Sequence, residues 1–570
     1  MNAPLSPVST DATENAGLPL AAEAETHVVF NQSEALEGHN LYLGDDALRD
    51  GLVREGGGSA DADLRRYGAA CGEAATIELG FLANEHKPQL HAHDRFGHRV
   101  DVVKFHPAYH ELMRIALSEG LHSSPWTAPG PGAHVARAAK YYLHTQVEAA
   151  HCCPLTMTFA AVPTLRLTPS IAAAWLPKVT ARDYDPRNVS HDRKSALTIG
   201  MGMTEKQGGS DVRANTTRAT PAGPRGPGEL YSLVGHKWFL SAPMCDAFLM
   251  LAQAPGGLSC FLVPRWRPDG GRNPLEVQRL KNKMGNLANA SSEVELRGAL
   301  GWLVGEEGRG VPAIIEMVAL TRFDCMIGSS AGQRQAVVQA VHHATRRAAF
   351  GKRLIDQPLM RNVLADLHLE VEGSLAMTLR MARALDGAHD ERERLLLRLG
   401  TAVGKYWICK RTPNHAYEAM ECIGGNGVME DCIMPRLYRE AVINAIWEGS
   451  GNVQALDVLR VLAKTPRVLE GWFDEVDRSR GSHPLLDTAV DRLQAALKDP
   501  AEAEDRARHL MDQLALTFQA HLLLQAGNAA VAEGFIASRL SAHGERSYGT
   551  LPRGLDLQAL LERADPHAGN

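Results

Sequence analysis

The stretch that decides the fold is GMGMTEKQGGSDVRANTT, residues 200–217, in which a predicted β-strand runs into a loop with paired glycines and hydroxyl side chains. Glycine allows close backbone approach, so the loop N–H groups, Thr204 and Ser210 suit a phosphate or a flat polar ring. Taken alone, the same letters are more simply a hairpin or surface turn, because Gly, Ser and Asp are common in turns.

The spacing of apolar residues along the chain changes on either side of this loop. Apolar residues recur at helical spacing over residues 27–195, short β-type runs and turn residues alternate over 196–300, and the helical period returns over 301–465. Residues 466–570 are again mostly helical and predict an extra domain, whereas residues 1–26 lack Lys and Arg and predict a disordered tail. We expect an α+β, mostly helical fold around a central β-domain.

Composition and charge exclude several classes of protein. The 570 residues are 45% hydrophobic and 22% charged, which argues against collagen, a coiled coil or wholesale disorder. A formal net charge of −6 gives the chain as a whole no footprint for nucleic acid or anionic lipid. Nine scattered cysteines without a C-x-x-C pair predict reduced thiols, and no apolar run is long enough to span a membrane. We expect a cytoplasmic protein.

A second informative stretch is GHKWFLS, residues 235–241, on one predicted strand. Strand alternation places Trp238 and Leu240 on one face and Phe239 and Ser241 on the other. An aromatic side chain and a hydroxyl on this strand could both contact the ring of a bound ligand. A tryptophan buried in the core explains the same sequence.

The third stretch is AIWEGSGNVQALDVLR, residues 445–460, in which Glu448 stands between Trp447 and a Gly-Ser-Gly loop. Desolvation beside an indole would raise the pKa of this carboxylate, as a general base for a weakly acidic C–H requires. The alternative is an acid at a helix start, with Ser450 or Asn452 as the cap.

Five motifs stand in a specific order along the chain. They are M-T-E-x-x-x-G-S-D at 203–211, K-W-F-L-S at 237–241, R-x-x-F-G at 347–351, I-G-G-x-G at 423–427 and W-E-G-S at 447–450. In content, order and separation they resemble the acyl-CoA dehydrogenase superfamily of FAD-dependent flavoproteins.

Further stretches resemble its AidB-like branch, the flavoproteins of the adaptive response to alkylation. These are T-H-V-V-F-N-Q at 26–32, M-T-F-A-A at 157–161, T-E-K-Q-G-G-S-D-V at 204–212, T-R-F-D at 321–324 and P-R-L-Y-R-E at 435–440. The resemblance implies an N-terminal helical domain, a β-barrel-like middle domain, a C-terminal four-helix domain and an extra C-terminal helical domain. It also implies protection of DNA from alkylation damage.

The resemblance assigns roles to individual residues. Glu448 would be the base that removes the α-proton of an acyl-CoA-like thioester, with FAD as the cofactor. In a homotetramer, Arg347, Phe350, Gln357, Gly424 and Gly425 would reach FAD bound largely by a neighbouring subunit. The other expected FAD contacts are Met203, Thr204, Gly209, Ser210, Trp238, Phe239, Leu240, Ser241, Ile446, Trp447, Gly449, Ser450 and Asn452.

Double-stranded DNA is the macromolecular partner that the resemblance implies. Arg460, Lys464 and Arg467 follow one another at i, i+4 and i+7, one face of a predicted helix, and Arg478 and Arg480 come next. A solvated face explains these residues equally well. From residue 467 onward the chain has 11 Lys and Arg and 16 Asp and Glu. DNA binding there therefore requires the lysines and arginines to lie together on one surface.

Two rival functions remain open. One is a metabolic branched-chain acyl-CoA dehydrogenase without a DNA role, and the other is a flavin-stabilised DNA-binding protein without turnover. The large indole of Trp447 would narrow the acyl pocket, so we expect weak activity on substrates such as isovaleryl-CoA.

No metal site is expected, since we assign His91, His93, His98, His106 and His110 to surface loops and Cys152 and Cys153 to the core.

Overall fold

The computed structural model describes residues 26–499, 501, 503–541 and 547–567. The predicted tail, residues 1–26, lies outside the described residues except for Thr26. Within the described residues, no helix is long and apolar enough to cross a membrane.

The N-terminal part is built mainly from helices. They are α1 (Asp46–Arg54), α2 (Asp61–Gly72), α3 (Ala74–Glu85), α4 (Pro107–Ser118), α5 (Ser124–Thr127), α6 (Ala133–Val147), α7 (Cys152–Arg166) and α8 (Pro169–Val179). A β-hairpin, β1 (Gln89–His93) and β2 (Arg99–Lys104), interrupts them. The helical expectation is therefore wrong at this point, and His91 and His93 lie on a strand. The carboxylate of Asp94 accepts the N–H groups of Phe96 and His98 and so closes the turn.

The β-domain is a seven-stranded, barrel-like sheet. Its strands are β3 (Ile199–Gly202), β4 (Arg218–Pro221), β5 (Leu230–Ser241), β6 (Ala247–Ala254), β7 (Gly257–Pro264), β8 (Leu275–Leu280) and β9 (Ser291–Val304). They run in the order β3-β6-β4-β5-β9-β7, β8 pairs with β9, and β6 also pairs with β7. Apolar side chains from α7 and α8 complete the core of this domain.

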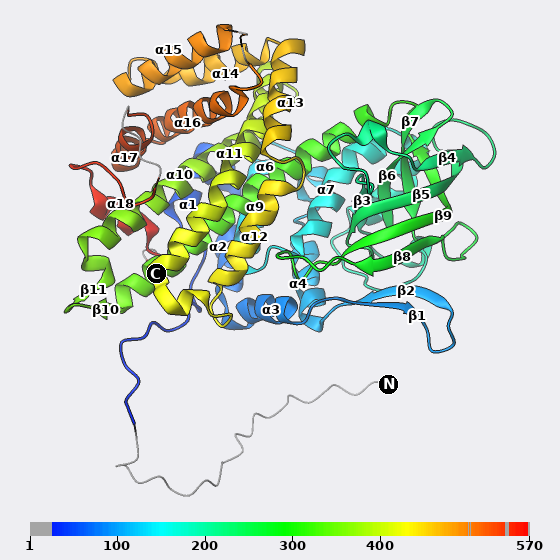
Figure 1. Cartoon of the computed structure of the whole chain (residues 1–570), viewed down its shortest axis with the longest axis horizontal. Coiled ribbons are helices and arrows are strands. Elements are labelled where there is room, and N and C mark those ends of the chain that lie inside the picture. Colours follow the sequence, from blue (N-terminus) through cyan, green and yellow to red (C-terminus); the bar gives the residue numbers. More distant parts are fainter. Residues whose placement is uncertain (1–25, 500, 502, 542–546, 568–570) are drawn as a thin grey trace, which may run out of the picture.

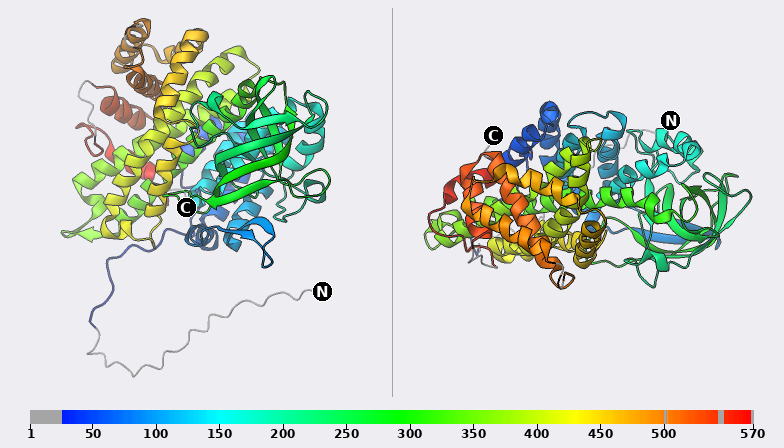
Figure 2. Two further views of the ribbon diagram at one scale, coloured as in Figure 1. Left: turned by 45° about the vertical axis from the view of Figure 1, so that its right-hand side comes forward. Right: turned by 90° about the horizontal axis from the view of Figure 1, so that it is seen from above.

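Four long helices form the C-terminal part of the dehydrogenase-like region. They are α9 (Gly310–Arg346), α10 (Pro358–Asp386), α11 (Glu391–Ile423) and α12 (Met434–Ile446), with a small hairpin, β10 (Ala348–Ala349) and β11 (Lys352–Arg353), between α9 and α10. The β-domain lies at one end of the molecule and these helices lie toward the other, as all views show (Figures 1 and 2).

Helix α13 (Gly451–Lys464) leads into the extra C-terminal helices. These are α14 (Val468–Val476), α15 (Pro484–Lys498), α16 (Ala507–Ala526), α17 (Ala529–Arg539) and α18 (Leu557–Ala564). Helices α14, α16, α17 and α18 pack against α10 or α11, and α15 packs against α16 and α17 (Figure 1). Trp472 of α14 is fully buried and stacks on Phe518 of α16, and both belong to the core that contains the four long helices. The extra helices are thus part of one continuous hydrophobic core.

Candidate active site

The turn that carries Glu448 joins α12 to α13. Glu448 has φ +57° and Gly449 has φ +99°, so two successive residues adopt left-handed backbone conformations. Such a conformation is uncommon for a glutamate and costs free energy, which the surrounding contacts must offset. At φ +99° Gly449 has a backbone conformation that residues with a Cβ atom rarely adopt, so this position favours glycine. The backbone strain marks this turn as a functional candidate.

The carboxylate of Glu448 is held by one hydroxyl. Thr321 of α9 donates its O–H to Oε2 of Glu448 at 2.7 Å. Burial raises the pKa of Glu448, while the Thr321 hydrogen bond and the cations of Arg322 and Lys405 oppose the rise. The group therefore ionises at a higher pH than an ordinary glutamate, which suits a general base for a C–H proton.

Three further side chains fix the backbone of the turn. Arg322 donates to the carbonyl of Glu448 at 3.0 Å, Lys405 donates to the carbonyl of Gly449 at 2.6 Å, and Gln454 donates to both carbonyls. Sequence reasoning missed these roles, although it noted the T-R-F-D motif. Among the hydrogen bonds of the described residues, none has the Glu448 N–H as donor, so this N–H is available to a ligand.

Glu448 lies where the helices meet the β-domain. Trp447 packs against the core of the β-domain, and its Nε1–H donates to Oδ1 of Asn444 at 2.9 Å. Burial raises the pKa of the Cys153 thiol to about 12, and Lys283, the Glu448 carboxylate and the Ser241 hydroxyl are near enough to affect it. Ser241 at the end of strand β5 and Glu448 therefore both lie near Cys153.

The loop after β3 is tied to β5 by a buried ion pair. Nζ of Lys237 lies 2.9 Å from Oε1 of Glu205, and both side chains are fully buried. Burial alone would raise the pKa of Glu205, but the Lys237 cation and N–H and hydroxyl donors of Thr216 and Thr217 hold it at about 2. This ion pair gives a structural reason for Glu205 in the M-T-E-x-x-x-G-S-D motif and for Lys237 in the K-W-F-L-S motif. The pair was not predicted from the sequence.

The same loop carries the residues expected to hold FAD. Met203 and Thr204 are partly buried, Ser210 is exposed, and the Trp238 N–H donates to the Thr204 carbonyl at 2.9 Å. A Cβ atom on Gly209 would lie 2.5 Å from Oγ1 of Thr204, so the close approach of these two residues depends on glycine.

The strand alternation expected for residues 238–241 is interrupted by a β-bulge. Lys237 pairs with Val294 and Leu240 with Ser292, so β5 has an extra residue here. As a result Trp238 and Phe239 both contact Nζ of Lys281, which lies 3.2 Å and 4.5 Å from their ring centres. Phe239 is 48% exposed, whereas the Leu240 side chain is buried in the core and leaves only its backbone for a ligand.

A second group of expected FAD contacts lies at the far end of α9. Arg347 donates to the carbonyl of Asn31, Gln357 donates to the carbonyl of Ala349, and Phe350 is fully exposed with φ +53°. Gly424 and Gly425 follow α11, and a Cβ atom on either would have no neighbour within 4 Å. Arg347 follows Thr321 by 26 positions, which at 1.5 Å per helical residue is roughly 39 Å. The structure therefore does not bring this group to Glu448 within one chain.

The start of α13 holds the remaining expected contacts. Ile446 is 63% exposed, and Ser450 is the residue that precedes the helix. Oδ1 of Asn452 accepts a hydrogen bond of 2.8 Å from Nε of Arg508 on α16. The extra C-terminal helices thus reach the loop that follows the base.

The basic residues expected to bind DNA do not share one helix face. Helix α13 ends at Lys464, and Arg467 precedes α14, because Pro466 lacks the N–H that would continue the helix. Arg467 pairs with Glu391 and Glu470, Arg478 with Glu475, and Arg480 with Asp477, Asp487 and Asp491. Arg460 and Lys464 are exposed, and neither forms an ion pair with a residue in the described ranges.

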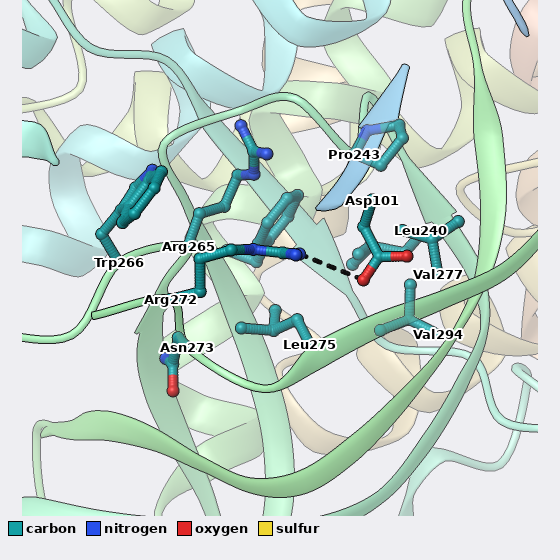
Figure 3. Close-up of a pocket in the computed structure, with 11 residues that line it drawn as sticks. Asp101, Leu240, Pro243, Arg265, Trp266, Arg272, Asn273, Leu275, Val277 and Val294 are labelled. Atoms are coloured by element: carbon teal, nitrogen blue, oxygen red, sulfur yellow. Dashed lines mark hydrogen bonds and ion pairs between the residues drawn. The ribbon is translucent and has the colours of Figure 1, made fainter. Parts of the chain in front are cut away.

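A small pocket lies under the β1–β2 hairpin, away from this turn. Arg272 and Asp101 form an ion pair of 3.1 Å across it, and Arg265 and Trp266 line it from the β-domain (Figure 3). Of the expected FAD contacts only Leu240 lines this pocket, so we do not assign it to the cofactor.

Three family models match successive parts of this chain. Residues 31–186 match the family model for the adaptive response protein AidB N-terminal domain, residues 200–299 the acyl-CoA dehydrogenase middle domain, and residues 308–463 its C-terminal domain. The chain is 46% identical to AidB of Escherichia coli (strain K12) over 91% of this chain and 95% of that protein. It is 30% identical to acyl-CoA dehydrogenase family member 11 of Caenorhabditis elegans over 85% and 84% of the two chains.

A solved structure supports the same conclusion. The crystal structure of Caenorhabditis elegans ACDH-11 in complex with C11-CoA superposes with a TM-score of 0.81 at 27% identity, covering 96% of this chain and 95% of that chain. The expected fold class is confirmed. The chain belongs to the AidB-like branch of the acyl-CoA dehydrogenase family, whose members use FAD.

Proposed function

We propose that this protein is an FAD-dependent oxidoreductase that acts weakly on acyl-CoA thioesters of the isovaleryl-CoA type, with Glu448 as its base. The observation that carries the proposal is the partly buried carboxylate of Glu448, which lies on a strained turn beside the β-domain and accepts a hydrogen bond from Thr321. The C11-CoA complex of the similar ACDH-11 supports a thioester of this class.

The residues present fit FAD. The loop at Gly209 makes an approach to Thr204 that a Cβ atom would prevent, and the bulge in β5 presents the rings of Trp238 and Phe239 on one side. Hydroxyl and N–H groups of Thr204 and Ser210 and the backbone up to Ser241 would hold the ring and ribityl parts. When bound, FAD supplies the acceptor for the β-hydride of the substrate.

The side chains of this protein carry the proton chemistry. Glu448 takes the α-proton on its carboxylate, and the Thr321 hydroxyl holds Oε2 in place for that transfer. The free N–H of Glu448 would donate to the thioester carbonyl and stabilise the charge that develops there. Arg322, Lys405 and Gln454 keep the turn from relaxing, since they bind its two carbonyl groups.

We further propose a homotetramer in which each FAD is shared between subunits. The roughly 39 Å of helix between Thr321 and Arg347 separates the two groups of expected FAD contacts in one chain. The exposed Phe350, Leu359 and Val428 lie on the part that would meet the neighbour. Mass photometry should find four chains, and Phe350→Asp should lower both assembly and flavin content. Loss of assembly without loss of flavin in this variant would refute the shared site.

The activity is tested by the flavin spectrum. The purified protein should be yellow, and anaerobic isovaleryl-CoA should bleach it. Glu448→Gln should abolish bleaching while keeping the flavin bound, and Glu421→Gln, an exposed control on α11, should bleach like the wild type. Bleaching that persists in Glu448→Gln would remove Glu448 as the base. A yellow protein that no thioester bleaches would favour the flavin-stabilised, non-catalytic function.

The second proposed function is binding of double-stranded DNA and its protection from alkylation. Similarity to E. coli AidB and the exposed Arg460 and Lys464 on α13 support it. Phosphate contacts dominate such binding and make it fall with salt. In gel shifts, Arg460→Ala with Lys464→Ala should weaken binding and lower the salt slope by about two. Arg480→Ala is the control, because three carboxylates already engage that side chain.

A gel shift that shows no complex even at low salt would reject this second function. It would then favour a branched-chain acyl-CoA dehydrogenase without a DNA role. Equal weakening by Arg480→Ala would instead place the DNA site elsewhere on the protein.

A further inference from the structure

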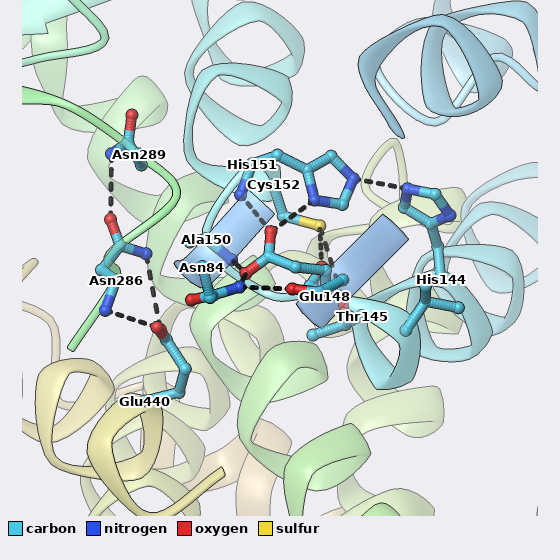
Figure 4. Close-up of polar contacts among 12 residues, drawn as sticks. Asn84, His144, Thr145, Glu148, Ala150, His151, Cys152, Asn286, Asn289 and Glu440 are labelled. Carbon is cyan, nitrogen blue, oxygen red and sulfur yellow. Dashed lines mark hydrogen bonds and ion pairs between the residues drawn. The ribbon is translucent and has the colours of Figure 1, made fainter. Parts of the chain in front are cut away.

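The turn between α6 and α7 gathers metal-ligating side chains in the interior of the protein. His144 lies in the last turn of α6, and His151 and Cys152 stand at the start of α7. One ring nitrogen of each histidine and Sγ of Cys152 lie within 4.8 Å of one another, and all three residues are buried (Figure 4). Nothing in the proposed dehydrogenase chemistry uses this cluster.

The outer nitrogen of each imidazole is already engaged. Nδ1 of His151 lies 2.7 Å from Oε2 of Glu148, and Nδ1 of His144 lies 2.7 Å from the Tyr67 hydroxyl. Glu148 is itself held by Nδ2 of Asn84 at 3.0 Å and by two backbone N–H groups (Figure 4). A histidine that binds a metal through one nitrogen typically has such a partner on the other, and a carboxylate is a common one.

The inner nitrogens face each other. Nε2 of His144 lies 2.6 Å from Nε2 of His151, with the ring planes at 79°. Because the Glu148 carboxylate can only accept, Nδ1 of His151 carries a proton, so in the neutral ring Nε2 of His151 accepts and His144 is the donor. The thiol of Cys152 has only weak partners, the Glu148 carbonyl at 3.5 Å and the Thr145 hydroxyl at 3.8 Å.

The geometry points to a buried site for a thiophilic d10 ion, Zn²⁺ or Cu⁺, bound by His144, His151 and Cys152. Imidazole and thiolate ligands suit both ions, and a set of two histidines and one cysteine is known for copper. On binding, the Cys152 thiol loses its proton to solvent, and the proton on Nε2 of His144 moves to Nδ1, which then donates to Tyr67. The two Nε2 atoms must separate from 2.6 Å to about 3.3 Å to accept bonds of about 2.0 Å.

The role of such an ion would be structural. It would link the end of α6 to the start of α7, the helix whose further residues complete the core of the β-domain. No metal is expected here from the sequence, in which Cys152 is assigned to the core and His144 and His151 are not singled out. The turn of the chain at Glu148 brings them together.

The test is metal binding by the full-length holoprotein. The reduced wild type is titrated with Zn²⁺ and, separately, with Cu⁺ against a competing chelator, and bound metal is counted after desalting. Cys152→Ser should weaken binding of the preferred ion at least tenfold. Cys153 is the neighbouring buried cysteine. Cys153→Ser should bind the metal like the wild type, and it controls for the general effect of losing a buried thiol.

X-ray absorption of the metal-loaded wild type keeps the proposal falsifiable if Cys152→Ser does not fold. We expect one sulfur near 2.3 Å and imidazole nitrogens near 2.0 Å. Two results would overturn the site: no stoichiometric uptake of either ion, which leaves a shared proton between the histidines, or a metal with oxygen and nitrogen neighbours only, which is an adventitious ion.

Discussion

The hydroxyl of Thr321 should determine how far the pH can fall before the reaction slows, because it controls the pKa of Glu448. It donates a hydrogen bond of 2.7 Å to Oε2 of Glu448, and this bond favours the ionised carboxylate. A hydrogen bond to a charged group contributes about 1.5–3 kcal/mol, and one pKa unit corresponds to about 1.4 kcal/mol. Thr321→Val should therefore raise the pKa of Glu448 by a further one to two units.

The direction of the effect follows from the chemistry of the base. Glu448 must be ionised to accept a proton, and burial already raises its pKa. A further rise moves the acid limb of the pH–rate profile to higher pH and leaves the rate at the alkaline plateau close to that of the wild type. The measurement is the rate of anaerobic flavin bleaching by isovaleryl-CoA at limiting substrate, followed across pH.

Two variants separate this effect from general damage. Thr321→Ser retains the hydroxyl and should retain the wild-type acid limb. Thr517→Val removes an equally buried hydroxyl on α16 that bonds only to backbone carbonyls, so it should change stability alone. An unchanged acid limb in Thr321→Val, or the same shift in Thr517→Val, would refute the reasoning.

Other parts of the structure give equally direct expectations. Lys237→Met leaves Glu205 buried without its cation and should cost about 3–5 kcal/mol in urea unfolding, and adding Glu205→Gln should restore part of it; no recovery would contradict the pair. Gly209→Ala places a Cβ atom against Thr204 and should weaken flavin retention about tenfold, or 1.4 kcal/mol, on dilution. Trp472→Ala should cost about 3–5 kcal/mol in a single unfolding transition shared with the four long helices, and two separate transitions would contradict the common core.

The sequence predicted the fold correctly and singled out Glu448 as the proposed base, because both inferences rest on local patterns. W-E-G-S places a glycine after Glu448, and the left-handed backbone at this position favours glycine. The residues that contact Glu448 and its turn could not be predicted from these local patterns. Thr321 and Lys405 lie 127 and 44 positions from the atoms they bind, and only the packing of α9 and α11 against the turn brings them there.

Strand alternation failed at one place for a local reason. The sequence K-W-F-L-S predicts one aromatic ring on each face of β5, yet the bulge after Lys237 brings Trp238 and Phe239 to the same cation. A bulge depends on how the neighbouring strand pairs, here β9, and the letters of β5 alone do not specify it. The motif therefore predicted a ligand-binding strand but not the side from which the rings would approach the ligand.

The extra C-terminal helices change how the DNA function must be studied. Their charge balance is acidic, and the structure shows much of the basic complement held in ion pairs, as for Arg478 and Arg480. Phosphates would have to displace those carboxylates, whereas Arg460 and Lys464 are exposed on α13. Truncation before α14 is unsuitable as a test, because it would uncover the core surface that Trp472 covers and would unfold what it is meant to compare. Only substitutions that change charge without changing the core can separate DNA binding from the stability of the dehydrogenase fold.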